Sequence, residues 1–153
     1  MDVRSGGDAR PAVVCCHGPD QSKDGGIFPA LADRLARAGF AAVTFDHSGD
    51  PSNDETAIAD LGIVLDALAR GDLGPAPTAI GVLGDGPGGA IAVRRAASDA
   101  RIRAVVIWNG AASEPRGAAP CLALSLPAAG AAATPEWPQT LDATVTWFAR
   151  HLA

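Results

Sequence analysis

The chain has no tyrosine and only one lysine, so two kinds of general catalyst are absent or scarce. Lys23 is the single lysine among 153 residues. A Schiff base on a lysine amine would therefore have to use Lys23, and acid catalysis by a phenol is excluded. The three cysteines, two of which are the neighbours Cys15 and Cys16, do not make a disulfide framework.

Long apolar runs and an excess of positive charge are also missing. No run reaches the roughly 20 apolar residues that cross a bilayer, and residues 1–8 contain no apolar signal core, so we expect a cytoplasmic protein. With 12 Lys and Arg against 17 Asp and Glu, the net charge is −5. This charge argues against nucleic acid and against membrane as partners.

The composition that remains is that of a folded protein. Hydrophobic residues make up 48% of the chain and charged residues 19%, which is too apolar and too weakly charged for a disordered chain. The length fits one domain, and no internal boundary divides it, so residues 1–153 are expected to form a single domain.

Short apolar runs alternate with amphipathic stretches. The runs predict five strands, at residues 11–16, 40–45, 77–83, 102–108 and 120–126. Helical spacing predicts helices at 28–38, 54–70 and 87–98, and a last helix that Thr134 caps. Strands separated by helices predict an α/β fold, a three-layer αβα sandwich around a five-stranded parallel sheet.

Polar and titratable side chains gather where these predicted strands end. Ligands of parallel sheets bind beyond the carboxyl ends of the strands. The residues expected to bind a ligand there are Cys16, His17, Gly18, Pro19, Ser48, Gly86, Pro87, Trp108 and Asn109. The candidate catalytic residues are Asp46, His47 and Asp85.

Several of these residues have two interpretations. Asp46 and His47 form a candidate acid–base pair, because a tuned imidazole carries protons near neutral pH. Asp85 is either a general base or a carboxylate that caps the next helix. Trp108 either walls an apolar pocket or packs the core. His17 is either a loop-packing residue or a catalyst.

Cys15 and Cys16 alternate along one strand and therefore point to opposite faces of the sheet. One of them is expected in the core, and the other is a candidate for the edge of the cleft. A reactive thiolate needs an electropositive neighbour, and His17 is the only local one.

The glycine-rich turn at 84–89 matches the dinucleotide pattern G-x-G-x-x-G. The acid expected after the next strand is replaced by Asn109, and Pro87 lacks an N–H donor. A cramped turn that only glycine tolerates is the simpler interpretation, so no cofactor is expected. No ligand-spacing motif supports a metal cluster of Asp46, His47 and Asp85, so no metal is expected either.

The order of these segments resembles an α/β-hydrolase. The resemblance rests on Val13-Val14-Cys15-Cys16-His17-Gly18, on the helix that ends at Gly39-Phe40, on Val43-Thr44-Phe45-Asp46-His47-Ser48-Gly49, and on Gly84-Asp85-Gly86-Pro87-Gly88-Gly89. The last helix, with 147–152, looks like the closing helix of dienelactone-hydrolase-like members. The resemblance implies the strand order 2-1-3-4-5, and it implies that Asp46 organises its loop. The additional N-terminal strands, the lid and the last strand of the family are expected to be absent.

This chain departs from the catalytic pattern of that family. The elbow G-x-S-x-G has glycine at the nucleophile position, Gly86. The residue after the nucleophile supplies an oxyanion-hole N–H in the family, but here it is Pro87, and Pro19 takes the position of the other donor. Residues 122–134 contain no Asp, Glu or His, and His151 falls inside the last helix.

Three functions follow as hypotheses. The first is a non-hydrolytic protein that binds a small, partly apolar ligand at the strand ends and assists acid–base chemistry such as isomerisation or cyclisation. The second is an ester or lactone hydrolase whose nucleophile has moved to Cys16 or Ser48, beside His17 or His47. The third is a structural or interaction protein. A homodimer through the last strand or the last helix is also expected, because a bare apolar edge invites pairing.

Overall fold

The computed structural model describes residues 1–4, 7–18, 22–49, 53–110, 119–125 and 136–153. Pro19 and Thr134 lie outside the described residues. The elements are, in chain order, β1 Asp2–Arg4, β2 Ala12–Cys16, α1 Phe28–Arg37, β3 Ala41–Thr44, α2 Asp54–Arg70, β4 Ile80–Asp85, α3 Pro87–Ala96, β5 Ile102–Trp108, β6 Cys121–Leu124 and α4 Glu136–Leu152.

One mixed sheet has the order β1-β3-β2-β4-β5-β6. The last five strands in this order are parallel to one another, and they confirm the predicted order 2-1-3-4-5. The prediction of five strands was wrong by one: β1 pairs antiparallel with β3 at the edge. The expectation that no additional N-terminal strand is present was therefore also wrong.

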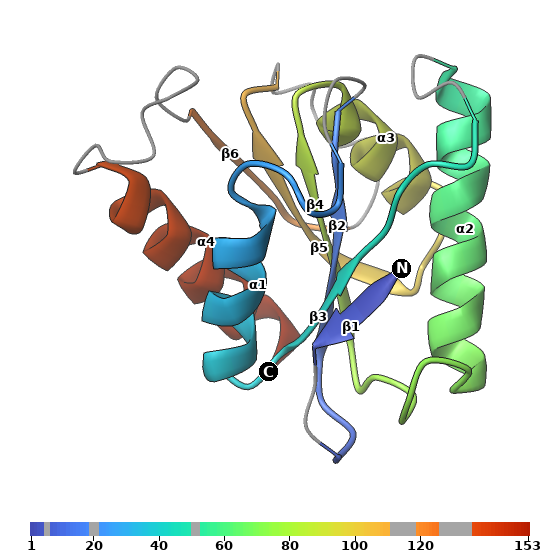
Figure 1. Ribbon diagram of the computed structural model, residues 1–153, viewed down its shortest axis with the longest axis horizontal. Helices are drawn as coiled ribbons and strands as arrows, with labels where there is room; N and C mark the ends of the chain where they lie inside the picture. Colours follow the sequence, from blue (N-terminus) through green and yellow to red (C-terminus); the bar gives the residue numbers. More distant parts are fainter. Residues whose placement is uncertain (5–6, 19–21, 50–52, 111–118, 126–135) are drawn as a thin grey trace.

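The helices cover both faces of the sheet, as the three-layer prediction required (Figure 1). On one face, α2 and α3 bury residues such as Leu61, Leu65 and Ile91 against Val82 and Val105. On the other face, α1 and α4 pack with the remaining alternate strand residues, among them Val13, Leu83 and Val106. The carboxyl ends of the parallel strands lie together at one edge of the sheet, at the top of Figure 1.

Local signals account for where α2 and α3 begin and for where α2 ends. Asn53 caps α2, since its side-chain oxygen accepts hydrogen bonds from the N–H groups of Glu55 and Thr56. Gly71 ends α2 in the left-handed conformation, with φ 77°. Pro87 occupies the first turn of α3, where a missing N–H costs nothing.

The predicted strand at 77–83 begins and ends too early. β4 starts at Ile80 and continues through Gly84 and Asp85, which pair with Ile107 and Trp108 of β5. Asp85 is therefore the last residue of a buried strand, and Gly86 takes the N-cap position of α3.

Among the helices of the described ranges, none combines the length and the apolar character needed to span a bilayer.

Candidate functional site

The turn between β4 and α3 has an unusual backbone. Gly86 has φ 56° and ψ −121°, a conformation that side chains rarely adopt. Its N–H donates to the carbonyl of Trp108 at 2.7 Å, and its own carbonyl accepts from Gly89 at 3.0 Å. This sharp strand-to-helix turn is the geometry that presents a nucleophile in an elbow, and here it presents a hydrogen atom.

The glycines around Gly86 are required by close packing. A Cβ on Gly84 would lie 2.2 Å from the carbonyl oxygen of Gly88, and one on Gly88 would lie 2.5 Å from the carbonyl oxygen of Cys16. A Cβ on Gly89 would lie 2.5 Å from Ile107. At Gly86 a Cβ would meet nothing within 4 Å. Gly86 therefore faces open space, whereas Gly84, Gly88 and Gly89 pack directly against other atoms of the protein.

His17 and Asp46 join two loops beside this turn. The His17 side chain is 5% exposed, and its Nε2 lies 3.2 Å from Asp46 Oδ1 without the alignment of a hydrogen bond. The His17 Nδ1 lies 2.7 Å from the Gly18 carbonyl, to which it donates. Asp46 also accepts a hydrogen bond from the backbone N–H of Lys23 at 2.8 Å. Asp46 thus fastens the loop before α1, which agrees with the loop-organising role that the resemblance implies.

His47 lies inward from this pair. Its side chain is 2% exposed, with Nε2 at 3.3 Å from the His17 carbonyl and Nδ1 at 3.8 Å from Asp60 Oδ2. Burial, and secondly the neighbouring His17 ring, lower the pKa of His47. The neutral imidazole is therefore favoured, with its Nε2–H donating to the carbonyl.

Asp60 of α2 organises the end of the second loop. One carboxylate oxygen accepts from the backbone N–H of Ser48 at 2.8 Å, and the other accepts from the Ser48 hydroxyl at 2.7 Å. The sequence interpretation missed Asp60. Its signal was its place beside Ala57 and Leu61 on the buried stripe of α2, where a carboxylate needs partners.

Asp85 and Asn109 form a second polar pair, at the ends of β4 and β5. Asn109 donates its side-chain N–H to Asp85 Oδ1 at 3.1 Å. Asp85 is 7% exposed, and Asn109 has a positive φ of 55°. The N-cap residue of α3 is Gly86, which follows Asp85. Asp85 therefore does not occupy the position from which the capping interpretation would have it act.

Three other candidates are core residues in this structure. Cys15 and Cys16 do point to opposite faces, but they are 2% and 0% exposed, so neither thiol reaches the cleft edge. Burial raises the pKa of Cys15 to about 12 and raises that of Cys16 still further. Trp108 is 0% exposed, and its indole N–H donates to Thr144 at 3.1 Å. Of its two interpretations, the structure supports core packing.

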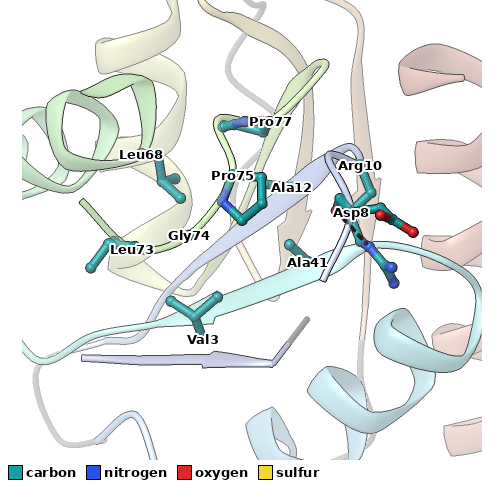
Figure 2. Close-up of a pocket in the computed structure, with 10 residues that line it drawn as sticks. All are labelled: Val3, Asp8, Arg10, Ala12, Ala41, Leu68, Leu73, Gly74, Pro75 and Pro77. Atoms are coloured by element: carbon teal, nitrogen blue, oxygen red, sulfur yellow. Dashed lines mark hydrogen bonds between the residues drawn. The ribbon is translucent and has the colours of Figure 1, made fainter. Parts of the chain in front are cut away.

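A cavity at the opposite end of the sheet is too small to be the ligand site. It lies among residues from β1, β2, α2 and the segment after α2, including Val3, Ala12, Leu68 and Pro77 (Figure 2). Its volume of about 10 Å³ holds at most one water molecule. Within the described part of the chain, no three His, Cys, Asp or Glu side chains group as metal ligands.

The fold has close counterparts among solved structures. A dienelactone hydrolase from Anabaena variabilis superposes with a TM-score of 0.81 and 16% identity, over 99% of this chain and 91% of that one. The esterase Est1E from Butyrivibrio proteoclasticus gives 0.59 and 22%, over 68% and 42%. The Pyrococcus furiosus esterase Pf2001 gives 0.60 and 20%, over 67% and 43%. The chain spans less than half the length of these two esterases.

No family model matches the sequence, and no curated protein matches it. The similarity is therefore one of structure. The sheet order, the two helix layers and the sharp turn after β4 define an α/β-hydrolase fold. Within that class the fold is dienelactone-hydrolase-like, as the resemblance predicted.

Proposed function

We propose that this chain is a non-hydrolytic protein built on an α/β-hydrolase fold, which binds a small, partly apolar ligand at the carboxyl ends of its strands. The observation that carries the proposal is Gly86. The elbow keeps its backbone conformation, yet its tip bears no side chain and faces open space. A ligand can approach the backbone there more closely than any serine would allow.

Pro87 supports the same conclusion. In an elbow, the N–H of the residue after the nucleophile stabilises the oxyanion, and proline has no N–H. Loss of one such donor lowers the rate by about 10²–10³. A chain that lacks both the elbow nucleophile and this donor lacks two of the groups that act directly on an ester carbonyl.

A relocated nucleophile fits the observed contacts poorly. The Cys16 thiol is buried and its raised pKa disfavours the thiolate. The Ser48 hydroxyl donates to Asp60, and Asp60 stands between it and His47. A triad needs the imidazole between serine and carboxylate, so this order is reversed.

Asp46 is the strongest candidate for any acid–base step. Its side chain is 50% exposed, whereas those of His47 and Asp85 are buried. The buried His17 ring lies beside it, with Nε2 3.2 Å from Asp46 Oδ1, and is the second candidate for proton transfer. Isomerisation or cyclisation of the bound ligand would need only such proton transfers.

A fluorophosphonate probe and a panel of short aryl esters test the loss of hydrolysis. We expect no labelling and no turnover above that of the Ser48→Ala variant. Iodoacetamide should leave the native protein's Cys16 unmodified. Labelling of Ser48, or ester turnover that Ser48→Ala or iodoacetamide abolishes, would establish the hydrolase alternative instead.

A fragment screen by NMR tests ligand binding, with a matched pair of variants. Gly86→Ala adds a Cβ in the open space at the turn, and Gly26→Ala adds one at a similar positive φ, 58°, with equally empty surroundings. Fragments that bind the strand ends should lose affinity with Gly86→Ala and keep it with Gly26→Ala. If no fragment shifts the signals of Gly86 or His17, the ligand-binding proposal fails and an interaction role is favoured.

A further inference from the structure

Arg103 occupies a break in the pairing of β4 and β5, at the opposite end of the sheet from Gly86. Ile80 pairs with Ile102 and Gly81 pairs with Ala104, so Arg103 has no partner residue on β4. One extra residue in one strand is a β-bulge, which redirects the side chain it carries.

The bulge keeps Arg103 out of the core. Val105 and Ile107 pack on the face that α2 and α3 cover, and strict alternation would place Arg103 on that face as well. Instead, Ile102 takes the core position there, and Arg103 is the one exposed residue of β5. A guanidinium that would be costly to bury is thus turned outward.

Two shallow grooves meet at Arg103. One has a volume of about 330 Å³, and its lining includes Pro77, Thr78, Ala79, Ile80, Ala100 and Arg103. The other has a volume of about 240 Å³ and is lined by Ala96, Ala100, Ile102, Arg103 and Ala119. The larger one lies within the size range of small-molecule sites, and most of its lining is apolar.

Among the described residues, Arg103 differs from its neighbour Arg101 in having no carboxylate partner. Arg101 binds Asp66 and Asp99 through hydrogen bonds of 2.7 Å each, so its charge is balanced. Within the described ranges, neither an ion pair nor a side-chain hydrogen bond joins Arg103 to another residue. A guanidinium without an ion-pair partner among the described residues attracts a carboxylate, whose two oxygens match its planar fork of N–H donors.

We propose that the Arg103 grooves form a second binding site, for a small carboxylic acid with a compact apolar body. The guanidinium pairs with the carboxylate through two parallel hydrogen bonds, and the alanine, proline and isoleucine surfaces cover the apolar part. This site is independent of the strand-end site, because it lies at the amino ends of β4 and β5.

Hexanoate is a suitable probe, with hexanamide as its neutral counterpart. In an NMR titration we expect hexanoate to shift the amide signals of Thr78, Ala79 and Ala100 in a saturable manner, in the millimolar range or tighter. The signals of Gly86 and His17 should not move. Hexanamide should bind at least tenfold more weakly.

Three variants separate charge from shape. Arg103→Gln should weaken hexanoate binding at least tenfold, and Ala100→Leu should weaken it by filling the volume that both grooves share. Arg37→Gln, which removes another exposed arginine at the end of α1, should leave binding unchanged. Equal melting temperatures would verify that the exposed substitutions leave the fold intact.

Three results would overturn the proposal. They are the absence of saturable shifts around Ala100, equal binding of hexanoate and hexanamide, and unchanged binding by Arg103→Gln. None of these results bears on Gly86, so this proposal and the proposed function stand or fall separately.

Discussion

At the scale of single residues, Gly84 and Gly86 differ in what a methyl group would meet. Gly84 lies where β4 and α3 approach so closely that only a hydrogen atom fits between their backbones. Gly86 is constrained by its φ angle and has open space in front of it. One glycine therefore serves the packing of the turn, and the other leaves the turn without a functional group.

Gly84→Ala should destabilise the fold strongly. The new Cβ would lie 2.2 Å from the Gly88 carbonyl oxygen, so the first turn of α3 must shift away from β4. We expect a loss of about 3 kcal/mol or more in the free energy of unfolding, at the upper end of overpacking effects. Urea denaturation measures this loss. Gly7→Ala, where a Cβ meets nothing within 4 Å, is the control and should change stability by less than about 0.5 kcal/mol. Similar losses in both variants would contradict the packing argument.

At the scale of elements, the hydrophobic pattern predicted most strands and helices but not their polar ends. β4 continues through Gly84 and Asp85 because β5 offers pairing partners there, and this is a tertiary effect. β1 is only three residues long and contains one apolar residue, Val3, so no alternation could show it. The bulge at Arg103 depends on the neighbouring strand and leaves no signal in its own sequence.

The candidate site shows the same division between local and tertiary signals. His17, Asp46 and Asp85 lie at the ends of parallel strands, so parallel topology places them together at the carboxyl-end edge of the sheet. Asp60 reaches that edge from a helix face, so listing the strand ends could not find it. The burial of Cys16 follows from α3 packing over the end of β2, which strand periodicity alone does not reveal.

The connection between α3 and β5 depends on an ion-pair network around Asp99. Arg95 and Arg101 both donate to this carboxylate, at 2.7–3.1 Å, and its side chain is 7% exposed. The hydrogen bonds from Arg101 come first among the causes that hold the pKa of Asp99 well below its ordinary value of 3.8. The folded state therefore binds fewer protons than the unfolded state near and below that pH. The stabilisation is complete above about pH 4 and is lost as the pH falls further through the folded-state pKa.

Asp99→Asn should remove this stabilisation. At pH 7 we expect a loss of about 1.5–3 kcal/mol in the free energy of unfolding, the range for hydrogen bonds to charged groups. In urea denaturation, the difference from the native sequence should shrink between pH 4 and pH 2, because over this range the carboxylate takes up a proton in the unfolded state while it stays ionised in the folded state. Asp72→Asn breaks an exposed pair with Arg70 and should cost less than about 1 kcal/mol at any pH. A pH-independent difference for Asp99→Asn would refute the electrostatic explanation.

At the scale of the whole molecule, the two edges of the sheet are protected differently. The β1 edge carries the charged residues Asp2 and Arg4. In the part of the chain that the structure describes, β6 pairs only with β5, and residues 119–125 contain no charged side chain. An uncharged strand edge presents free N–H and C=O groups to another chain. Of the two surfaces predicted for the homodimer, the last strand and the last helix, this edge favours the strand, with two β6 strands joined antiparallel across a two-fold axis.

Ala123→Lys should disrupt this dimer. Ala123 is exposed at the middle of the edge, and in a two-fold pairing its substitution brings two ammonium groups close together, which edge pairing does not tolerate. Sedimentation velocity over a range of concentrations should show a dimer for the native sequence and a monomer for Ala123→Lys. Ala97→Lys places the same charge at the exposed end of α3 and should remain dimeric. A native protein that stays monomeric at high concentration would show that the β6 edge is not an interface between copies. If Ala123→Lys and Ala97→Lys dissociate the dimer equally, general charge repulsion explains the effect and the interface does not lie at β6.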